Sequence, residues 1–135
     1  MAKLRFGHAI LLAFCSAILT LTAAAAQMPL PAAKPPDGAT LFKQQCATCH
    51  TIDPTETVRQ GPALSKIIGR QAGKADGFHY SPGLAKADFV WDEARLDAWL
   101  TNPQELIPGQ RMNFRVAAAE DRADIIAYLR EQSGR

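Results

Sequence analysis

The sequence predicts an all-helical domain with long loops. Three segments place apolar residues at the spacing of a helix that buries one face. No segment shows the two-residue alternation that a half-buried strand requires. Residues 51–89 are rich in Gly, Pro, Asp and Thr and follow neither period. So long a loop inside a compact domain is uncommon and needs something to pack against.

The elements follow one another along the chain with recognisable start and stop signals. A first helix is expected after Asp37, a residue that caps helix N-termini, and it continues to Cys46. A short helical turn is expected at residues 63–68, ended by a glycine. A second clear helix spans residues 92–102 and ends before Pro103, and residues 103–114 form a loop. The last helix spans about residues 118–132, with acidic residues in its first turns, where the helix dipole favours them.

The first 26 residues have the organisation of a secretory signal peptide. A basic start is followed by an apolar run and then by small residues, and cleavage is expected after Ala26. The run is short for a helix that crosses a bilayer. An uncleaved anchor is the alternative, and contact with a membrane is expected only in that case. Residues 27–36 form a proline-rich leader, residues 37–135 form the domain, and the periplasm is the expected compartment.

The net charge of the mature chain depends on that cleavage. The whole chain has a formal net charge of +2, from 15 basic and 13 acidic residues. Lys3 and Arg5 both lie in the expected signal peptide, so the mature chain has 13 of each. Nucleic-acid binding needs a strongly basic face, which a neutral chain does not favour.

The segment Cys46-Ala47-Thr48-Cys49-His50 matches the attachment sequence of a covalent c-type haem. Two thiols at this spacing can each add to a vinyl group of one porphyrin, and the adjacent imidazole can bind the iron. Three alternatives are a thioredoxin-like pair, a zinc site and a chance match. The first needs a βαβ context, and the second needs four ligands, for which only His79 remains in the mature chain.

Met112 is the expected second axial ligand. It stands in a polar loop between Ile107 and Phe114, and a methionine that merely fills a gap in the core is the alternative. Thioether ligation raises the reduction potential of a haem iron. Two filled axial positions leave no site for a substrate, so an electron carrier is expected rather than an enzyme.

These residues resemble the small soluble (class I) cytochrome c family, which includes mitochondrial cytochrome c and its bacterial periplasmic relatives. The resemblance covers about Asp37 to Gln132. It implies the cytochrome c fold, with about three main helices plus short ones and long loops wrapped around one covalent haem. It also implies that the first and last helices cross, through Gly38 and Phe42 on one side and Ile125 and Tyr128 on the other.

The resemblance further implies a set of residues around the haem. The Pro62 carbonyl would accept the Nδ1 hydrogen of His50, and Arg70, Tyr80 and Trp91, with Phe78, would hold a haem propionate. His50 and Met112 would be the metal ligands, and His79 would not be one. The expected haem-binding residues are Cys46, Cys49, His50, Met112, Pro62, Arg70, Tyr80 and Trp91.

The sequence also departs from the family pattern. Trp99 stands where the family often has a tyrosine near the methionine ligand, so a hydrogen bond to the sulfur would change or vanish. A short deletion precedes the last helix, around residues 116–119. Positions where mitochondrial members carry lysines around the haem edge hold Gln45, Gln104 and Glu105, while Arg111 stays basic. Electrostatic attraction to an acidic partner should therefore be weak.

A monomeric one-electron shuttle between redox proteins is the leading hypothesis, with donor and acceptor unspecified. The alternatives are a haem subunit of a periplasmic dehydrogenase complex and a haem peroxidase in which Met112 dissociates. Family members with lysines beside the methionine loop can exchange methionine for lysine at high pH. That exchange is expected to be shifted here, or to use another ligand.

Overall fold

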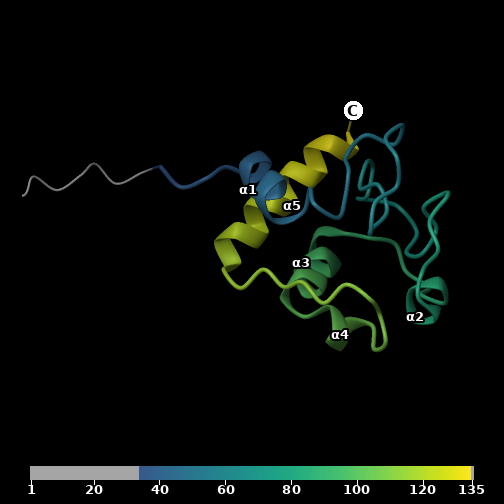
Figure 1. Ribbon diagram of the computed structural model, residues 1–135. Helices are drawn as coiled ribbons and strands as arrows, with labels where there is room; N and C mark the ends of the chain where they lie inside the picture. Colours follow the sequence, from purple (N-terminus) through teal and green to yellow (C-terminus); the bar gives the residue numbers. More distant parts are fainter. Residues whose placement is uncertain (1–33, 135) are drawn as a thin grey trace, which may run out of the picture. The chain divides into compact units, whose positions relative to one another are not determined.

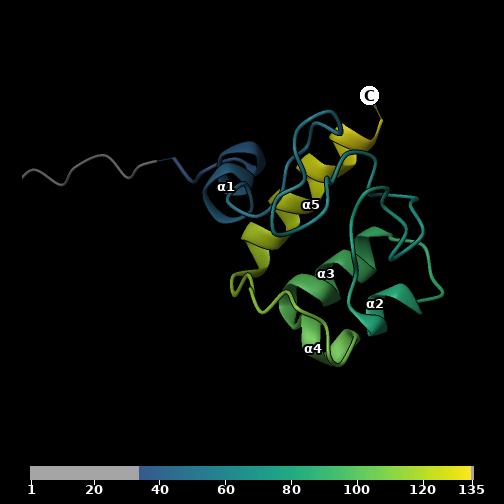
Figure 2. The same cartoon turned by 45° about the vertical axis from the view of Figure 1, so that its right-hand side comes forward.

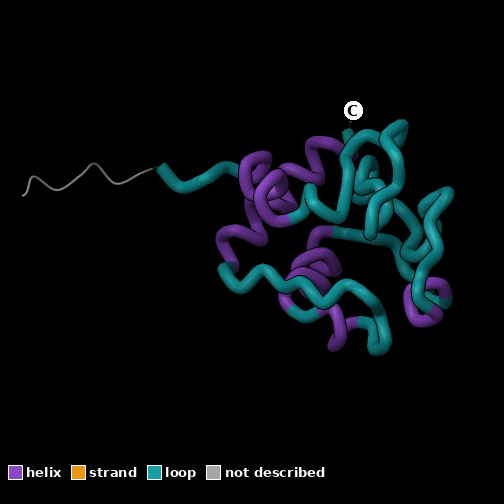
Figure 3. Tube along the Cα trace, in the orientation of Figure 1, coloured by secondary structure: helices purple, strands orange, loops and turns teal. Residues whose placement is uncertain are grey.

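The computed structural model describes residues 34–134 (Figure 1). Within this range the chain forms five helices: α1 (Gly38–Gln45), α2 (Pro82–Ala85), α3 (Glu93–Thr101), α4 (Pro103–Leu106) and α5 (Ala119–Ser133). The described residues form no strand, and one isolated antiparallel bridge joins Gln71 and Val90. The rest is loop, as the tube in Figure 3 shows. The prediction of an all-helical domain with long loops is confirmed.

Helices α1 and α5 pack against each other, in agreement with the expected crossing (Figures 1 and 2). Gly38 makes the close approach possible, because a Cβ atom there would lie 2.1 Å from the carbonyl oxygen of Asp124. One turn further on, the rings of Phe42 and Tyr128 meet with their centroids 5.4 Å apart. Only glycine fits at the crossing point.

The long helices begin and end close to where the sequence predicts. Asp37 caps α1 by accepting a hydrogen bond from the Thr40 N–H at 2.8 Å, and Asp92 caps α3 by accepting one from the Arg95 N–H at 2.7 Å. Helix α3 ends where Asn102 turns extended, with φ −156°, the conformation that a following proline favours. Explicit capping residues thus locate these helices.

The prediction of a helical turn at residues 63–68 is wrong. This segment forms turns, and Lys66 takes a left-handed conformation with φ 51°, which interrupts a helix. Carbonyl groups of this segment also bind Arg70. Nη1 of Arg70 donates to the carbonyl oxygens of Ala63 at 2.9 Å and Ser65 at 3.2 Å.

Short helices beside the three main ones were expected, but the positions of the two that form were not. Helix α2 lies in the predicted loop 51–89, and α4 occupies the first four residues of the predicted loop 103–114, so the loop prediction is wrong there. Each begins with a proline, at Pro82 and Pro103. Proline suits the first helical position because its missing N–H would have no partner there.

The core lies between α1, α3 and α5 and extends into the loops. On α5 the expected apolar face is buried at Ile125, Ile126 and Leu129, while Tyr128 is partly buried. On α3 the indole of Trp99 lies inward with its neighbours, whereas Ala94, expected on the same side, is exposed. The buried apolar residues are Leu41, Phe42, Ile67, Ala72, Trp91, Leu96, Trp99, Leu100, Ile107, Val116, Ile125, Ile126 and Leu129.

The short connection before α5 is fixed by Arg122. Its guanidinium donates to the carbonyl oxygens of Val116 and Ala117, both at 3.1 Å, and to Asp97 at 2.7 Å. Ala118 offers no side-chain cap at the start of α5. The arginine therefore ties the entry of α5 to α3 in place of a capping residue.

None of the helices within residues 34–134 is long and apolar enough to cross a membrane. The expected signal peptide and most of the proline-rich leader lie outside the described residues. Lys34, Pro35 and Pro36, the last residues of that leader, are exposed and not helical. The cleavage after Ala26 and the domain boundaries stay predictions.

Candidate haem site

One cavity of about 310 Å³ brings together all eight residues that the sequence predicts around a haem. His50 and Met112 both line it, although they lie far apart in the chain. Phe78, His79 and Ser81 also line it, and the last of these was not expected from the sequence. The expected residues in its wall are Cys46, Cys49, His50, Pro62, Arg70, Tyr80, Trp91 and Met112.

The end of α1 forms the turn that carries the two cysteines. The Cys46 N–H closes the helix by donating to the Phe42 carbonyl at 2.8 Å, and the N–H groups of Cys49 and His50 both donate to the Cys46 carbonyl, at 3.0 and 2.9 Å. This tight turn directs both sulfur atoms and the imidazole to the cavity. Burial, with a smaller contribution from Cys49, raises the pKa of the free Cys46 thiol to about 11.

The His50 ring is held in one orientation. Its Nδ1 lies 2.8 Å from the Pro62 carbonyl oxygen, which can only accept, so Nδ1 carries the hydrogen and Nε2 has a free lone pair. A Cβ atom on Gly61 would lie 2.2 Å from Cε1 of the ring, so the backbone passes directly against it. Burial lowers the pKa of His50, and Arg70 lowers it further, against the opposing effect of the Pro62 hydrogen bond. The neutral, metal-binding form is therefore favoured.

Met112 is held by an indole. Nε1 of Trp99 donates to Sδ of Met112 at 3.1 Å. Trp99 is buried on α3, and its ring packs edge-on against Trp91, with centroids 5.6 Å apart. From the sequence we expected the hydrogen bond to this sulfur to change or vanish. The bond is present, and its donor is the Trp99 indole.

A polar wall lies beside this aromatic pair. Arg70 and Trp91 are joined through their backbones, because the Trp91 N–H donates to the Arg70 carbonyl at 2.9 Å. Nε of Arg70 and Oγ of Ser81 are buried without a hydrogen-bond partner among the described residues. The hydroxyl of Tyr80 accepts from the Ala75 N–H at 3.3 Å and keeps its own hydrogen available. Buried polar atoms left over in a cavity wall fit an anionic ligand group such as a carboxylate.

Comparison with known proteins agrees with this geometry. Residues 36–133 match the family model described as Cytochrome c. The chain belongs to the cytochrome c family. It is 42% identical to a cytochrome c of Theileria annulata over 107 residues, 78% of this chain and 92% of the relative. It is 40% identical to cytochrome c2 of Rhodomicrobium vannielii, over 76% of this chain and 82% of the relative. It is also 40% identical to cytochrome c of Kluyveromyces lactis, over 76% and 96%.

As a member of the cytochrome c family, the chain is an electron carrier with one covalent c-type haem, attached through Cys46 and Cys49. The residues present fit that group. The cavity joins two cysteines to a nitrogen donor and a sulfur donor, and its wall holds the unpartnered Arg70 and Ser81 atoms. Within residues 34–134, no three His, Cys, Asp or Glu side chains are grouped to hold a metal ion. The iron of cytochrome c comes with its porphyrin.

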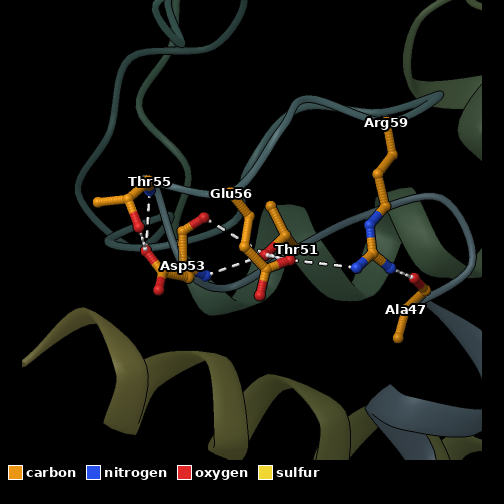
Figure 4. A network of polar contacts seen from close by, with 6 residues as sticks. All are labelled: Ala47, Thr51, Asp53, Thr55, Glu56 and Arg59. Carbon is orange, nitrogen blue, oxygen red and sulfur yellow. Dashed lines mark hydrogen bonds and ion pairs between the residues drawn. The ribbon is translucent and has the colours of Figure 1, made fainter.

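A polar network supports the attachment turn from the solvent side (Figure 4). The Arg59 guanidinium donates to the carbonyl oxygen of Ala47, between the two cysteines, and pairs with Glu56 at 3.1 Å. Thr51 donates to the same carboxylate at 2.9 Å and accepts from the Asp53 N–H at 3.1 Å. This network was not predictable from the sequence, because contacts between separate polar side chains leave no periodic pattern.

The rim of the cavity, meaning the exposed residues that line it, carries one formal charge. Its members are Gln60, His79, Asn113 and Phe114, with Arg111 as the cation beside Met112. Nη1 of Arg111 donates to the His79 carbonyl at 3.4 Å, which joins the methionine loop to the opposite loop. Cytochrome c acts with redox partner proteins, and this rim offers them few fixed charges.

Proposed function

We propose that this cytochrome is a one-electron shuttle of the bacterial periplasm, with its iron coordinated by Nε2 of His50 and Sδ of Met112. The observation that carries the proposal is that both atoms belong to one cavity and that each side chain is already fixed by a hydrogen bond, from His50 to Pro62 and from Trp99 to Met112. The haem supplies the redox chemistry, through iron that changes by one electron.

The surrounding residues keep the iron ligands still during that change. The Pro62 carbonyl and the Gly61 backbone hold the imidazole in one plane. The Trp99 indole, itself packed against Trp91, holds the sulfur. Ligands that do not rearrange between the two oxidation states need little reorganisation when an electron moves. This favours a carrier over an enzyme.

Arg70, Tyr80, Ser81 and Trp91 form the part of the wall that would hold a haem propionate. Nη1 of Arg70 is used by the Ala63 and Ser65 carbonyls, which leaves Nε for an anion. Burial lowers the pKa of Arg70, but an arginine stays protonated throughout the physiological range. A partly buried guanidinium with a buried Nε would stabilise the propionate charge and fix the haem plane.

The ligation is tested by Met112→Leu, which keeps most of the apolar volume and removes the sulfur donor. We expect the sulfur-to-iron absorption band of the oxidised protein to disappear and the reduction potential to fall, because thioether ligation raises it. Val58→Leu, at an exposed position outside the cavity wall, is the control and should keep the band. An unchanged band and potential in Met112→Leu would remove Met112 from the ligand set.

Location is tested by expression of the full chain with its own N-terminus in a Gram-negative host that matures c-type haems. We expect haem protein in the periplasmic fraction, with Gln27 as its first residue. Support comes from the signal-like pattern of residues 1–26. Retention in the membrane fraction with Met1 present would instead favour the uncleaved anchor, and a cytoplasmic product would contradict export.

A haem subunit of a periplasmic dehydrogenase complex is the second candidate. The observation that favours it is the scarcity of charge at the cavity rim, because a fixed partner needs no long-range steering. Purification decides between the two proposals. A monomer that exchanges electrons with several unrelated redox proteins supports the shuttle, whereas co-purification with one dehydrogenase supports the subunit.

The peroxidase alternative requires that Met112 leave the iron. The Trp99 hydrogen bond opposes that step. A purely low-spin spectrum in the resting oxidised protein, with no turnover of hydrogen peroxide, is the expected result. A high-spin fraction with peroxide turnover would favour the peroxidase.

A further inference from the structure

Gln104 makes more hydrogen bonds to the methionine loop than any other described side chain. Its Nε2 donates to the Gln110 carbonyl oxygen at 3.0 Å and to Oδ1 of Asn113 at 3.1 Å. Its Oε1 accepts from the Gly109 N–H at 3.0 Å. Both amide hydrogens and the amide oxygen are therefore used, on residues that lie on both sides of Met112.

The loop has little other support of its own. Within residues 108–115, the one backbone-to-backbone hydrogen bond joins the Gln110 N–H to the Ile107 carbonyl, and it is long, at 3.4 Å. Pro108 has no N–H, and Gly109 takes a left-handed conformation with φ 77°. Beyond Gln104, the side-chain bonds to this loop are those of Trp99 with the sulfur and of Arg111 with His79.

Helix α4 gives Gln104 a firm base. Pro103 is fully buried, and the Ile107 N–H closes the helix on the Pro103 carbonyl at 3.0 Å. Ile107 is itself buried, and α4 packs against α3, the helix that carries Trp99. A side chain that projects from this base can fix a loop that makes few bonds of its own.

We propose that Gln104 is a positioning residue that clamps the loop on both sides of Met112 and so keeps the sulfur on the iron against competing ligands. The proposal rests on the proposed His50 and Met112 ligation. The amide is suited to this task because it both donates and accepts. A lysine could not accept from Gly109, and a carboxylate could not donate to Gln110 and Asn113.

The test measures how tightly imidazole binds the oxidised, haem-loaded protein, because imidazole must displace Met112 to reach the iron. Gln104→Leu removes all three bonds, and we expect imidazole to bind about tenfold more tightly, since one net hydrogen bond is worth roughly a factor of two to ten. Asn113→Ala removes one bond and should have a smaller effect, of about threefold. Gln132→Leu, the same substitution on α5, is the control and should leave the affinity unchanged.

The double variant separates a clamp from general loosening. If Gln104 acts through Asn113, then Asn113→Ala should add nothing in the Gln104→Leu background, whereas independent effects would add. Gln104→Glu keeps the acceptor for Gly109 and loses both donors, and it carries the test if Gln104→Leu does not fold. Its affinity for imidazole should be higher than that of the native protein, because both donated bonds are lost.

The outcomes distinguish this inference from the ligation on which it rests. A native protein without a sulfur-to-iron band would overturn both. A native band with Gln104→Leu affinity within twofold of native, or with additive effects of the two substitutions, would overturn the clamp alone. Tighter imidazole binding in Gln104→Leu and in Gln104→Glu than in the native protein, with non-additivity between Gln104→Leu and Asn113→Ala, would together support it.

Discussion

At the scale of single residues, the hydrogen bond between Trp99 and Met112 is the most consequential contact of the site. An indole N–H can donate but cannot accept, so it always places a partial positive charge against the sulfur. That withdraws electron density from the proposed ligand and favours Fe(II). The bond therefore tunes the potential as well as positioning the side chain.

Trp99→Phe keeps an aromatic ring and removes that donor. We expect the reduction potential to fall by roughly 20–60 mV, which corresponds to one net hydrogen bond. Tyr128→Phe also removes one polar hydrogen from an aromatic side chain, on α5, and serves as the control in the same voltammetric measurement. A potential that does not move, or that moves equally in both variants, would show that the bond has no effect on the iron.

Gly61 offers a second test at this scale. A methyl group in Gly61→Ala would have to displace the His50 ring, whose Cε1 lies 2.2 Å from the Cβ position. We expect the free energy of unfolding in denaturant to fall by about 1–3 kcal/mol, as for other overpacked sites. Gly134→Ala, where the nearest atom lies 3.8 Å from the Cβ position, should be close to native. Equal stabilities would show that the ring can move aside.

Residue types with specific chemistry were predictable from the sequence, and the family resemblance also predicted the hydrogen bond between His50 and Pro62. The polar supports of the methionine loop were not predictable. Cysteine, histidine and methionine in a fixed order predict the haem-binding set, and the structure places that set around one cavity. From the sequence, Gln104 was notable only because mitochondrial members of the family carry a lysine at this position. Its three bonds depend on the path of a loop, which no periodicity encodes.

At the scale of elements, the loop 51–60 supports the attachment turn through Arg59. The ion pair with Glu56 is exposed and contributes little by itself. The bond to the Ala47 carbonyl is different, because it fixes the backbone between the two cysteines (Figure 4). A backbone hydrogen bond also closes the loop, because the Gly61 N–H donates to the Cys49 carbonyl at 2.8 Å.

Arg59→Ala should loosen this loop without unfolding the domain. We expect faster amide hydrogen exchange in residues 51–61, with the free energy of global unfolding lowered by no more than about 1 kcal/mol. Arg95→Ala removes a similar exposed arginine pair, with Asp92 at the start of α3, and should leave exchange in this loop unchanged. Native exchange rates in Arg59→Ala would mean that the backbone alone holds the turn.

The elements also show where prediction from sequence succeeds. Helices α1 and α3 were located because Asp37 and Asp92 cap them with hydrogen bonds of known pattern. The helical turn predicted at residues 63–68 does not form, because Arg70 binds the carbonyl groups that a helix would use. Helices α2 and α4 are too short for a period to appear, and only the proline at the start of each could have indicated them.

At the scale of the whole molecule, His50 links stability to pH. Burial holds the pKa of the folded-state imidazole below the ordinary value of 6.5, so below pH 6.5 the unfolded chain binds a proton that the folded chain refuses. Stability from this group is therefore full above pH 6.5 and falls as the pH drops toward the folded-state pKa. The proposed coordination to iron would use the same lone pair and lower that pKa further.

We expect the free energy of unfolding to be level near pH 7.5 and lower at pH 5.5, in denaturant titrations of the haem protein. His79→Gln removes the other histidine of the described residues and should keep the same pH dependence. Loss of the slope in His79→Gln would assign it to His79, and its absence from the native protein would contradict the linkage.

The contact between α1 and α5 has a consequence for how the protein is made. Gln45 and Asp121, on these two helices, are 76 residues apart in the chain, and the crossing at Gly38 closes only when both helices are present. A nascent chain that still lacks its last helix therefore cannot complete the domain. Until then we expect Cys46, which is partly buried in the finished fold, to be exposed and accessible for attachment of the porphyrin. Closure of the crossing then covers part of this cysteine.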